Sequence, residues 1–110
     1  MKLLVKKKQL AETPVLWLRR AGYAYIVDRR EDKESFVRRL TRDFYPRFHL
    51  YFEETNDKPS GDEVVIFNLH LDQKRPGYEG QSRHNAEYDG EIVEQEMERL
   101  KTFLLPDFFN

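Results

Sequence analysis

The sequence predicts one α+β domain over residues 1–110, in which helices pack on one face of an antiparallel sheet of about three strands. Residues 47–53 and 64–74 alternate polar and apolar side chains on either side of a turn-rich segment, as in a β-hairpin. Two other segments carry apolar residues at helical spacing. The chain is 39% hydrophobic and 14% aromatic, which suffices for the core of one domain of this length.

The first quarter of the chain predicts one helix followed by one strand. Residues 1–12 are compatible with a strand or with a short helix. Thr13 as N-cap and Pro14 at the first helical position begin a helix, and Gly22 is suited to end it. The run Tyr-Ala-Tyr-Ile-Val at residues 23–27 then predicts a strand, because aromatic and β-branched residues favour sheets.

The next segments predict a charged turn at residues 28–32 and a second helix at residues 35–41. Phe36, Val37 and Leu40 have the spacing of one helical face, which points inward. The arginines of the same helix would then point outward.

The C-terminal part predicts a long polar loop at residues 75–88 and a helix at about residues 90–104. Asp89 would cap this helix and Pro106 would end it. The expected inner stripe is Ile92, Val93, Met97, Leu100 and Leu104. The acidic run at residues 91–98 would form its solvated face. The apolar tail at residues 104–109, with Phe108 and Phe109, should pack on the core or on a second copy in a homodimer.

The predicted hairpin has one apolar and one polar face, because side chains alternate along a strand. The apolar face would carry Phe48, Leu50, Phe52, Val65, Phe67, Leu69 and Leu71. The polar face would carry Arg47, His49, Tyr51, Asn68, His70, Asp72 and Lys74. If the turn centres near Pro59, position 72 lies opposite position 46 or 47, and position 70 opposite position 48 or 49. Two of the three histidines of the chain therefore share one patch with an acid.

This polar face predicts a metal-assisted or phosphate-directed site. His70 and Asp72 would hold a divalent metal ion, together with His84 and Glu87 if the long loop folds over the sheet. His49 would act as general base, and Arg47 and Lys74 would stabilise the charge of a pentavalent phosphate. The alternative is a solvent-exposed sheet face with cross-strand ion pairs, on which Glu87 only favours the start of the following helix.

The net charge of −1 hides a strong asymmetry along the chain. Residues 1–50 hold 13 Lys and Arg against 6 Asp and Glu, whereas residues 51–110 hold 6 against 14. Either the two halves neutralise each other by packing together, or the basic half binds nucleic acid. In the second case the phosphate-contacting and base-stacking residues would be Arg38, Arg39, Arg42, Tyr51 and Arg75.

Several functional classes are excluded by composition. The chain has no cysteine, which excludes disulfides, thiol catalysis and cysteine-ligated metal sites. No apolar run approaches the roughly 20 residues of a membrane helix, and no signal peptide is evident at the start. No phosphate-cradling glycine loop and no nucleophile elbow is present. A cytoplasmic protein without a membrane partner is therefore expected.

Three segments, YPRFHLY at residues 45–51, HLDQK at residues 70–74 and EYDG at residues 87–90, resemble those of a small uncharacterised bacterial protein family. The resemblance extends over about residues 23–101. It implies a self-standing bacterial domain and carries no assigned activity or cofactor.

The leading functional hypothesis from the sequence is a nucleic-acid-acting domain with divalent-metal-dependent phosphodiester cleavage, of the nuclease or nickase type. The alternative is a non-catalytic module that binds protein through its apolar tail or nucleic acid through its arginines. The identity of the metal ion stays open.

Overall fold

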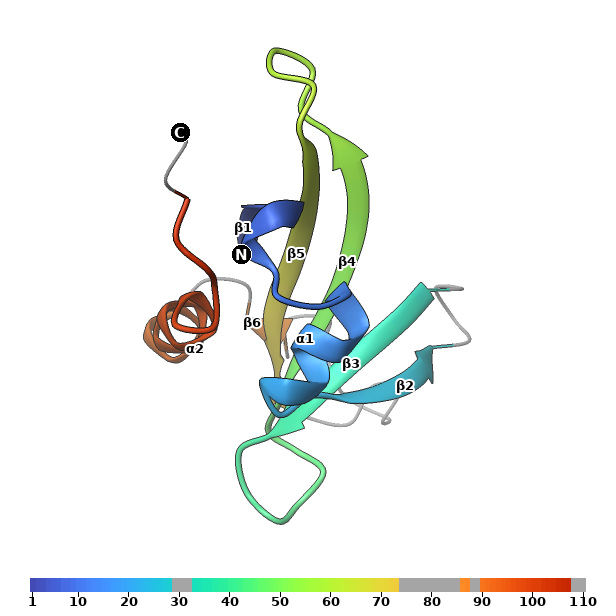
Figure 1. Cartoon of the computed structure of the whole chain (residues 1–110). Coiled ribbons are helices and arrows are strands. Elements are labelled where there is room, and N and C mark those ends of the chain that lie inside the picture. The colour runs from blue at the N-terminus through green and yellow to red at the C-terminus, as the bar shows by residue number, and fades with distance from the viewer. Residues whose placement is uncertain (29–32, 74–85, 88–89, 108–110) are drawn as a thin grey trace.

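The computed structural model describes residues 1–28, 33–73, 86–87 and 90–107. Figure 1 shows a twisted antiparallel sheet with strand order β1-β5-β4-β3-β2, and a short β6 that pairs with β5. The strands are β1 (Lys2–Lys6), β2 (Ala24–Asp28), β3 (Lys33–Arg39), β4 (Arg47–Asn56), β5 (Glu63–Asp72) and β6 (Ala86–Glu87). The helices are α1 (Pro14–Arg20), α2 (Glu91–Lys101) and the short 3₁₀ helix η1 (Lys7–Gln9). The predicted α+β class is confirmed, but three strands were too few.

The central hairpin of β4 and β5 has the predicted register. Arg47 lies opposite Asp72, and His49 lies opposite His70. On the apolar face, Phe67 and Leu69 are almost completely buried. Side chains alternate between the two faces along each strand, and directly paired residues share a face. This register therefore places the two histidines and Asp72 on the same face of the sheet.

The expected helix at residues 35–41 is wrong, since residues 35–39 belong to strand β3 and residues 40 and 41 lie in the bend that follows it. Phe36 pairs with Tyr25 of β2 on one side and with Leu50 of β4 on the other. Ser35, Phe36 and Val37 are all buried, so both faces of this strand are covered. In a strand that is buried on both faces, apolar residues do not alternate with polar ones. The spacing of the apolar residues then resembles that of a helix.

The first helix begins and ends where the sequence predicts. The hydroxyl of Thr13 accepts a hydrogen bond from the backbone N–H of Leu16 at 3.4 Å, and Pro14 follows it. At the other end, Gly22 has a φ of +99°, a conformation that favours glycine. The N–H groups of Gly22 and Tyr23 donate to carbonyls of the last turn, which is the Schellman arrangement. The ambiguous residues 1–12 supply both β1 and η1.

The core lies between the two helices and the apolar face of the sheet. Trp17 of α1 is fully buried and its ring lies 5.0 Å from that of Phe67 on β5. Val93 and Leu100 of α2 are also fully buried in this cluster. Ile92, expected in the inner stripe, is instead 46% exposed. The final helix is shorter than predicted, with Gly90 as its N-cap, and the predicted cap Asp89 lies outside the described residues.

The described part of the C-terminal tail packs on its own chain. The backbone N–H of Leu105 donates to the carbonyl of Gln9 at 2.8 Å. Asp107 forms ion pairs with Lys6 at 3.0 Å and with Lys8 at 3.3 Å. Phe108 and Phe109 lie outside the described residues, and the homodimer stays a prediction.

Ion pairs link the basic first half of the chain to its acidic second half. Besides the contacts of Asp107, they join Lys7 to Glu54, Arg38 to Glu96 and Arg47 to Asp72. This arrangement supports the interpretation that much of the charge asymmetry is neutralised inside the fold. Among the described residues, no helix has the length and apolar character needed to cross a membrane.

Candidate metal centre

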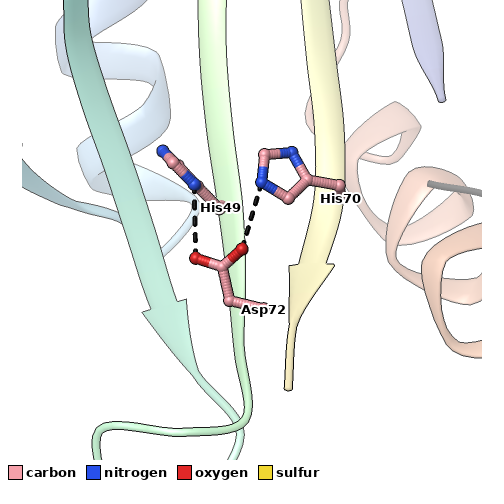
Figure 2. Close-up of side chains that lie close together, drawn as sticks. All are labelled: His49, His70 and Asp72. Atoms are coloured by element: carbon pink, nitrogen blue, oxygen red, sulfur yellow. Dashed lines mark ion pairs between the residues drawn. The ribbon is translucent and has the colours of Figure 1, made fainter. Parts of the chain in front are cut away.

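Two neighbouring strands bring His49, His70 and Asp72 together. His49 of β4 pairs directly with His70 of β5, and Asp72 follows two residues after His70 on the same face. Their neighbours Phe48, Leu50, Leu69 and Leu71 point to the opposite face, into the core beneath the helices. Figure 2 shows the carboxylate of Asp72 facing both imidazoles. The candidate centre therefore lies on the sheet face that is turned away from α1 and α2.

Each oxygen of Asp72 contacts a different histidine. Oδ2 lies 3.3 Å from Nδ1 of His49, and Oδ1 lies 3.1 Å from Nε2 of His70. The two imidazole rings are 4.5 Å apart between centroids and tilted by 57°. One potential ligand atom from each of the three residues lies within 4.8 Å of the other two. This is the only such group of three found among the residues that the structure describes.

Two of these separations are close to the distance between two ligands of one metal ion. Ligand atoms at the 2.0–2.2 Å that zinc prefers from nitrogen and oxygen lie roughly 3.3–3.6 Å apart when the arrangement is tetrahedral. The two nitrogen-to-oxygen distances of 3.3 and 3.1 Å are close to this range. Two imidazoles and one carboxylate also form a donor set that suits first-row transition metals. The two distances run to different oxygens of Asp72, so the side chains must adjust to place one ligand atom from each residue around a single ion.

The candidate centre is buried, contrary to the alternative of a solvent-exposed sheet face. The exposed fractions are 9% for His49, 8% for His70 and 8% for Asp72. Burial alone would raise the pKa of Asp72, but the hydrogen bonds and charges of His49 and His70 outweigh it and hold the pKa well below its usual range. The carboxylate is therefore ionised at neutral pH, as a metal ligand must be.

Arg47 closes one side of the centre. Its Nε donates to Oδ2 of Asp72 at 3.4 Å, and its guanidinium stacks over the ring of Tyr45 at 4.6 Å from the centroid. A guanidinium carries five donors, and within the described residues Asp72 receives one of them. A positive group is thus fixed beside the two histidines and the acid.

One polar atom at the centre has no hydrogen-bond partner in the part of the chain that the structure describes. Nε2 of His49 is buried and has no hydrogen-bond partner among the described residues. A buried imidazole nitrogen without a partner is costly, because it has lost its hydration without a replacement. This atom is therefore available to a ligand or to a transferable proton.

Arg47, His49, His70 and Asp72 lie close together, as predicted. The other predicted site residues lie elsewhere or outside the described residues. Lys74, Arg75 and His84 lie outside the described residues. Glu87 belongs to β6, whose backbone pairs with β5 at Leu71, but its side chain is not described. Tyr51 lies on the same face as His49, two residues further along β4 and opposite Asn68.

The three arginines predicted to share one outward face are separated: Arg38 and Arg39 lie on opposite faces of the sheet, and Arg42 lies in a loop. Arg38 points to the helix-covered face, where its Nη1 lies 3.5 Å from Oε1 of Glu96. Arg39 lies opposite Arg47 on the face of the candidate centre, and Arg42 is exposed in the loop after β3. The prediction that Arg38 points outward is wrong because a strand, unlike the expected helix, places consecutive residues on opposite faces.

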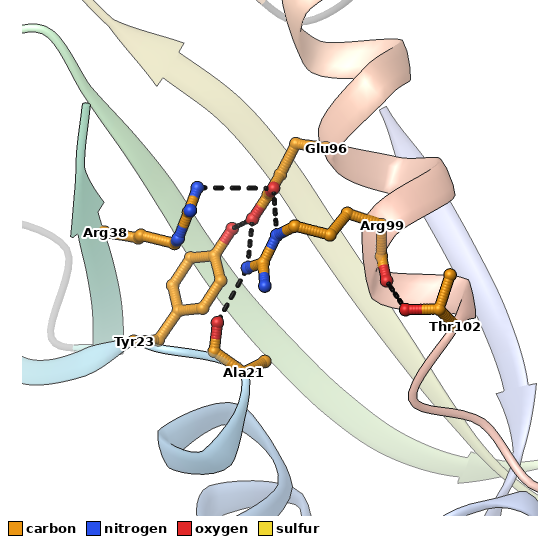
Figure 3. A network of polar contacts seen from close by, with 6 residues as sticks. All are labelled: Ala21, Tyr23, Arg38, Glu96, Arg99 and Thr102. Atoms are coloured by element: carbon orange, nitrogen blue, oxygen red, sulfur yellow. Dashed lines mark hydrogen bonds and ion pairs between the residues drawn. The ribbon is translucent and has the colours of Figure 1, made fainter.

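Glu96, expected on the solvated face of the final helix, is instead 4% exposed. Figure 3 shows its carboxylate surrounded by donors: the hydroxyl of Tyr23 at 2.6 Å, and Nε and Nη2 of Arg99 at 2.7 and 2.9 Å. The signal for this burial was its place in the apolar stripe, three residues after Val93 and four before Leu100. This network ties α2 to the end of α1 and to the sheet.

No family model, no curated protein and no solved structure matches this chain. The resemblance to a small bacterial family therefore stays a prediction, and the function must be argued from the candidate centre itself.

Proposed function

We propose that the protein binds a divalent transition-metal ion through His49, His70 and Asp72, and that the ion serves to hydrolyse phosphodiester bonds in nucleic acid. The observation that carries the proposal is the buried group of three ligand atoms within 4.8 Å of one another. Three protein ligands leave a coordination position for water, which is the pattern of catalytic rather than structural zinc sites. Such an ion lowers the pKa of its bound water and offsets charge on the phosphate.

In this proposal His49 is a ligand and not the general base that the sequence predicted. Its Nδ1 lies 3.3 Å from the Asp72 carboxylate, at the separation of two ligands of one ion. An ion held by these residues would supply a bound water of lowered pKa that loses its proton to solvent, so His49 would not be needed as a base. Arg47 is held beside Asp72 and is suited to contact a phosphate oxygen with its remaining donors. Lys74, His84 and Glu87 stay candidates for the same site.

The direct test is metal-dependent cleavage. Chelator-treated protein would be supplied with Mn²⁺, Co²⁺, Ni²⁺, Zn²⁺ or Mg²⁺ and incubated with supercoiled plasmid and with labelled single strands. Asp72→Asn should abolish cleavage, because the amide is a poor metal ligand. Glu53→Gln is the matched control, since Glu53 lies on the same strand face as His49 but is exposed. Absence of cleavage with every metal that binds would contradict the hydrolytic role.

A second candidate function is metal-free acid–base catalysis. The specific observation is the unpartnered Nε2 of His49, whose other ring nitrogen faces Asp72. An acid that orients an imidazole in this way favours one tautomer and leaves the far nitrogen to take a proton. Cleavage that persists in excess chelator and disappears in His49→Gln would favour this candidate over the metal centre.

A further inference from the structure

The loop between β3 and β4 presents an aromatic ring and cations to solvent at one end of the candidate centre. Phe44 is 64% exposed, which is unusual for so large an apolar side chain. The guanidinium of Arg39 lies 4.4 Å from the centroid of its ring. Next to it, Arg47 stacks on Tyr45 at 4.6 Å. Two consecutive aromatic residues are thus each stacked with an arginine.

The same end of the sheet holds a row of charges across three strands. Arg39 of β3 lies opposite Arg47 of β4, which lies opposite Asp72 of β5. With neighbouring strands about 4.8 Å apart, the backbone of Arg39 lies roughly 10 Å from that of Asp72. The row therefore leads from the loop directly to the candidate metal ligands.

Within the described residues, this row and the loop hold arginines that have no acidic partner. Two like charges placed directly opposite each other destabilise an antiparallel pair. Asp72 compensates Arg47, whereas neither Arg39 nor Arg42 forms an ion pair with an acid within the described residues. The formal charges of Arg39, Arg42 and Asp43 sum to +1. An anion bound beside Arg39 would relieve the repulsion.

We infer that this loop binds unpaired nucleotides of single-stranded nucleic acid, with a base stacked on Phe44 and phosphates beside Arg39 and Arg42. The inference rests on the proposed function and names its substrate class. Aromatic rings and arginine planes are the elements with which proteins hold single strands without reading their sequence. Paired bases in a duplex hide the faces that such a ring would contact, so the loop should prefer a single strand. Figure 1 places this loop at the end of the sheet where β3 and β4 join.

The test is fluorescence anisotropy with labelled thymidine oligonucleotides in chelator, so that no metal-dependent cleavage occurs. The wild type should bind the single strand more tightly than a duplex of equal length. Phe44→Leu, which keeps an apolar side chain but removes the ring, should weaken binding by about 5- to 150-fold, the effect of losing one stacked base. Phe44→Trp should retain binding. Tyr25→Leu, which removes another half-exposed aromatic ring on β2, is the matched control and should bind like the wild type.

The arginines are tested by the salt dependence of the same binding. Arg39→Gln and Arg42→Gln should each reduce the slope of log affinity against log salt by about 0.7, as expected for one lost phosphate contact on a single strand. Arg19→Gln, which removes an exposed arginine of α1, should leave the slope unchanged.

The outcomes separate this inference from the proposed function. Equal affinity of the wild type and Phe44→Leu, or tighter binding of the duplex, overturns the inference even if the protein binds metal. Oligonucleotide binding that depends on Phe44, in a protein that binds no metal, supports the inference and rejects the proposed metal centre. Loss of binding in Tyr25→Leu to the same extent as in Phe44→Leu also overturns it, because a general loss of structure would then explain both.

Discussion

Replacing Glu96 with glutamine should strongly destabilise the fold, because Glu96 is a buried anion held by several donors. Its oxygens accept from Tyr23 at 2.6 Å and from two nitrogens of Arg99 at 2.7 and 2.9 Å, with Arg38 at 3.5 Å. Breaking a buried ion pair by removing one partner costs about 3–5 kcal/mol. The side chains of Arg99 and Arg38 are 31% and 34% exposed and can regain hydration, so we expect the lower end of this range.

The measurement is urea denaturation followed by circular dichroism, with Glu98→Gln as the matched control. Glu98 lies two residues away on α2, is 72% exposed and pairs with Lys101 at 3.1 Å. An exposed pair of this kind contributes about 0.5 kcal/mol or less. Tyr23→Phe should lie between the two, at about 1.5–3 kcal/mol for one hydrogen bond to a charged acceptor. A loss of stability in Glu96→Gln no larger than that in Glu98→Gln would show that the buried network of Glu96 does not stabilise the fold.

Three further predictions concern the two ends of α1 and the C-terminal tail. Gly22→Ala should cost about 1–2 kcal/mol in urea denaturation, since its φ of +99° strains any L-residue; an unchanged midpoint would contradict this. Thr13→Ala should cost about 1 kcal/mol and Thr13→Ser much less, because only alanine removes the cap of α1; equal losses would argue against capping. The hydrogen bond from Lys6 lowers the pKa of Asp107, although burial acts in the opposite direction. The ionised Asp107 therefore stabilises the folded state above the usual carboxyl pKa, and this stabilisation is lost as the pH falls through the pKa that Asp107 has in the folded protein. The melting temperatures of the wild type and Asp107→Asn should therefore differ at pH 7 and converge in acid, and a difference that persists in acid would reject the ion pair.

The hairpin could be predicted from sequence because two local signals agree there. Alternation in both strands defines the faces, and the turn residues around Pro59 define the register. These signals place position 70 opposite position 48 or 49, and the structure pairs His70 with His49. The burial of His49, His70 and Asp72 could not be predicted from the sequence. Alternation shows which side chains share a face of the sheet, but not whether that face is shielded from solvent.

The error at residues 35–41 has a different cause. Phe36 and Val37 are adjacent and both buried, which happens in a strand covered on both faces as well as in a helix. Only the pairing with β2 and β4 decides between them, and the spacing of the apolar residues within residues 35–41 does not show that pairing. Glu96 was missed for a related reason: its partners Tyr23 and Arg38 are 73 and 58 residues away.

Metal binding at His49, His70 and Asp72 can be measured by titrating metal into chelator-treated protein while following the imidazole resonances of the histidines by NMR. One equivalent of Co²⁺ should saturate the wild type and shift the resonances of both His49 and His70, and Zn²⁺ should compete for the same site. Saturating metal at about 100 times its Kd should also add about 2.7 kcal/mol of stability. Asp72→Asn should lose the saturable shift, whereas Glu53→Gln should keep it. No saturable shift in the wild type, or one that is unchanged in Asp72→Asn, would contradict a metal centre at His49, His70 and Asp72.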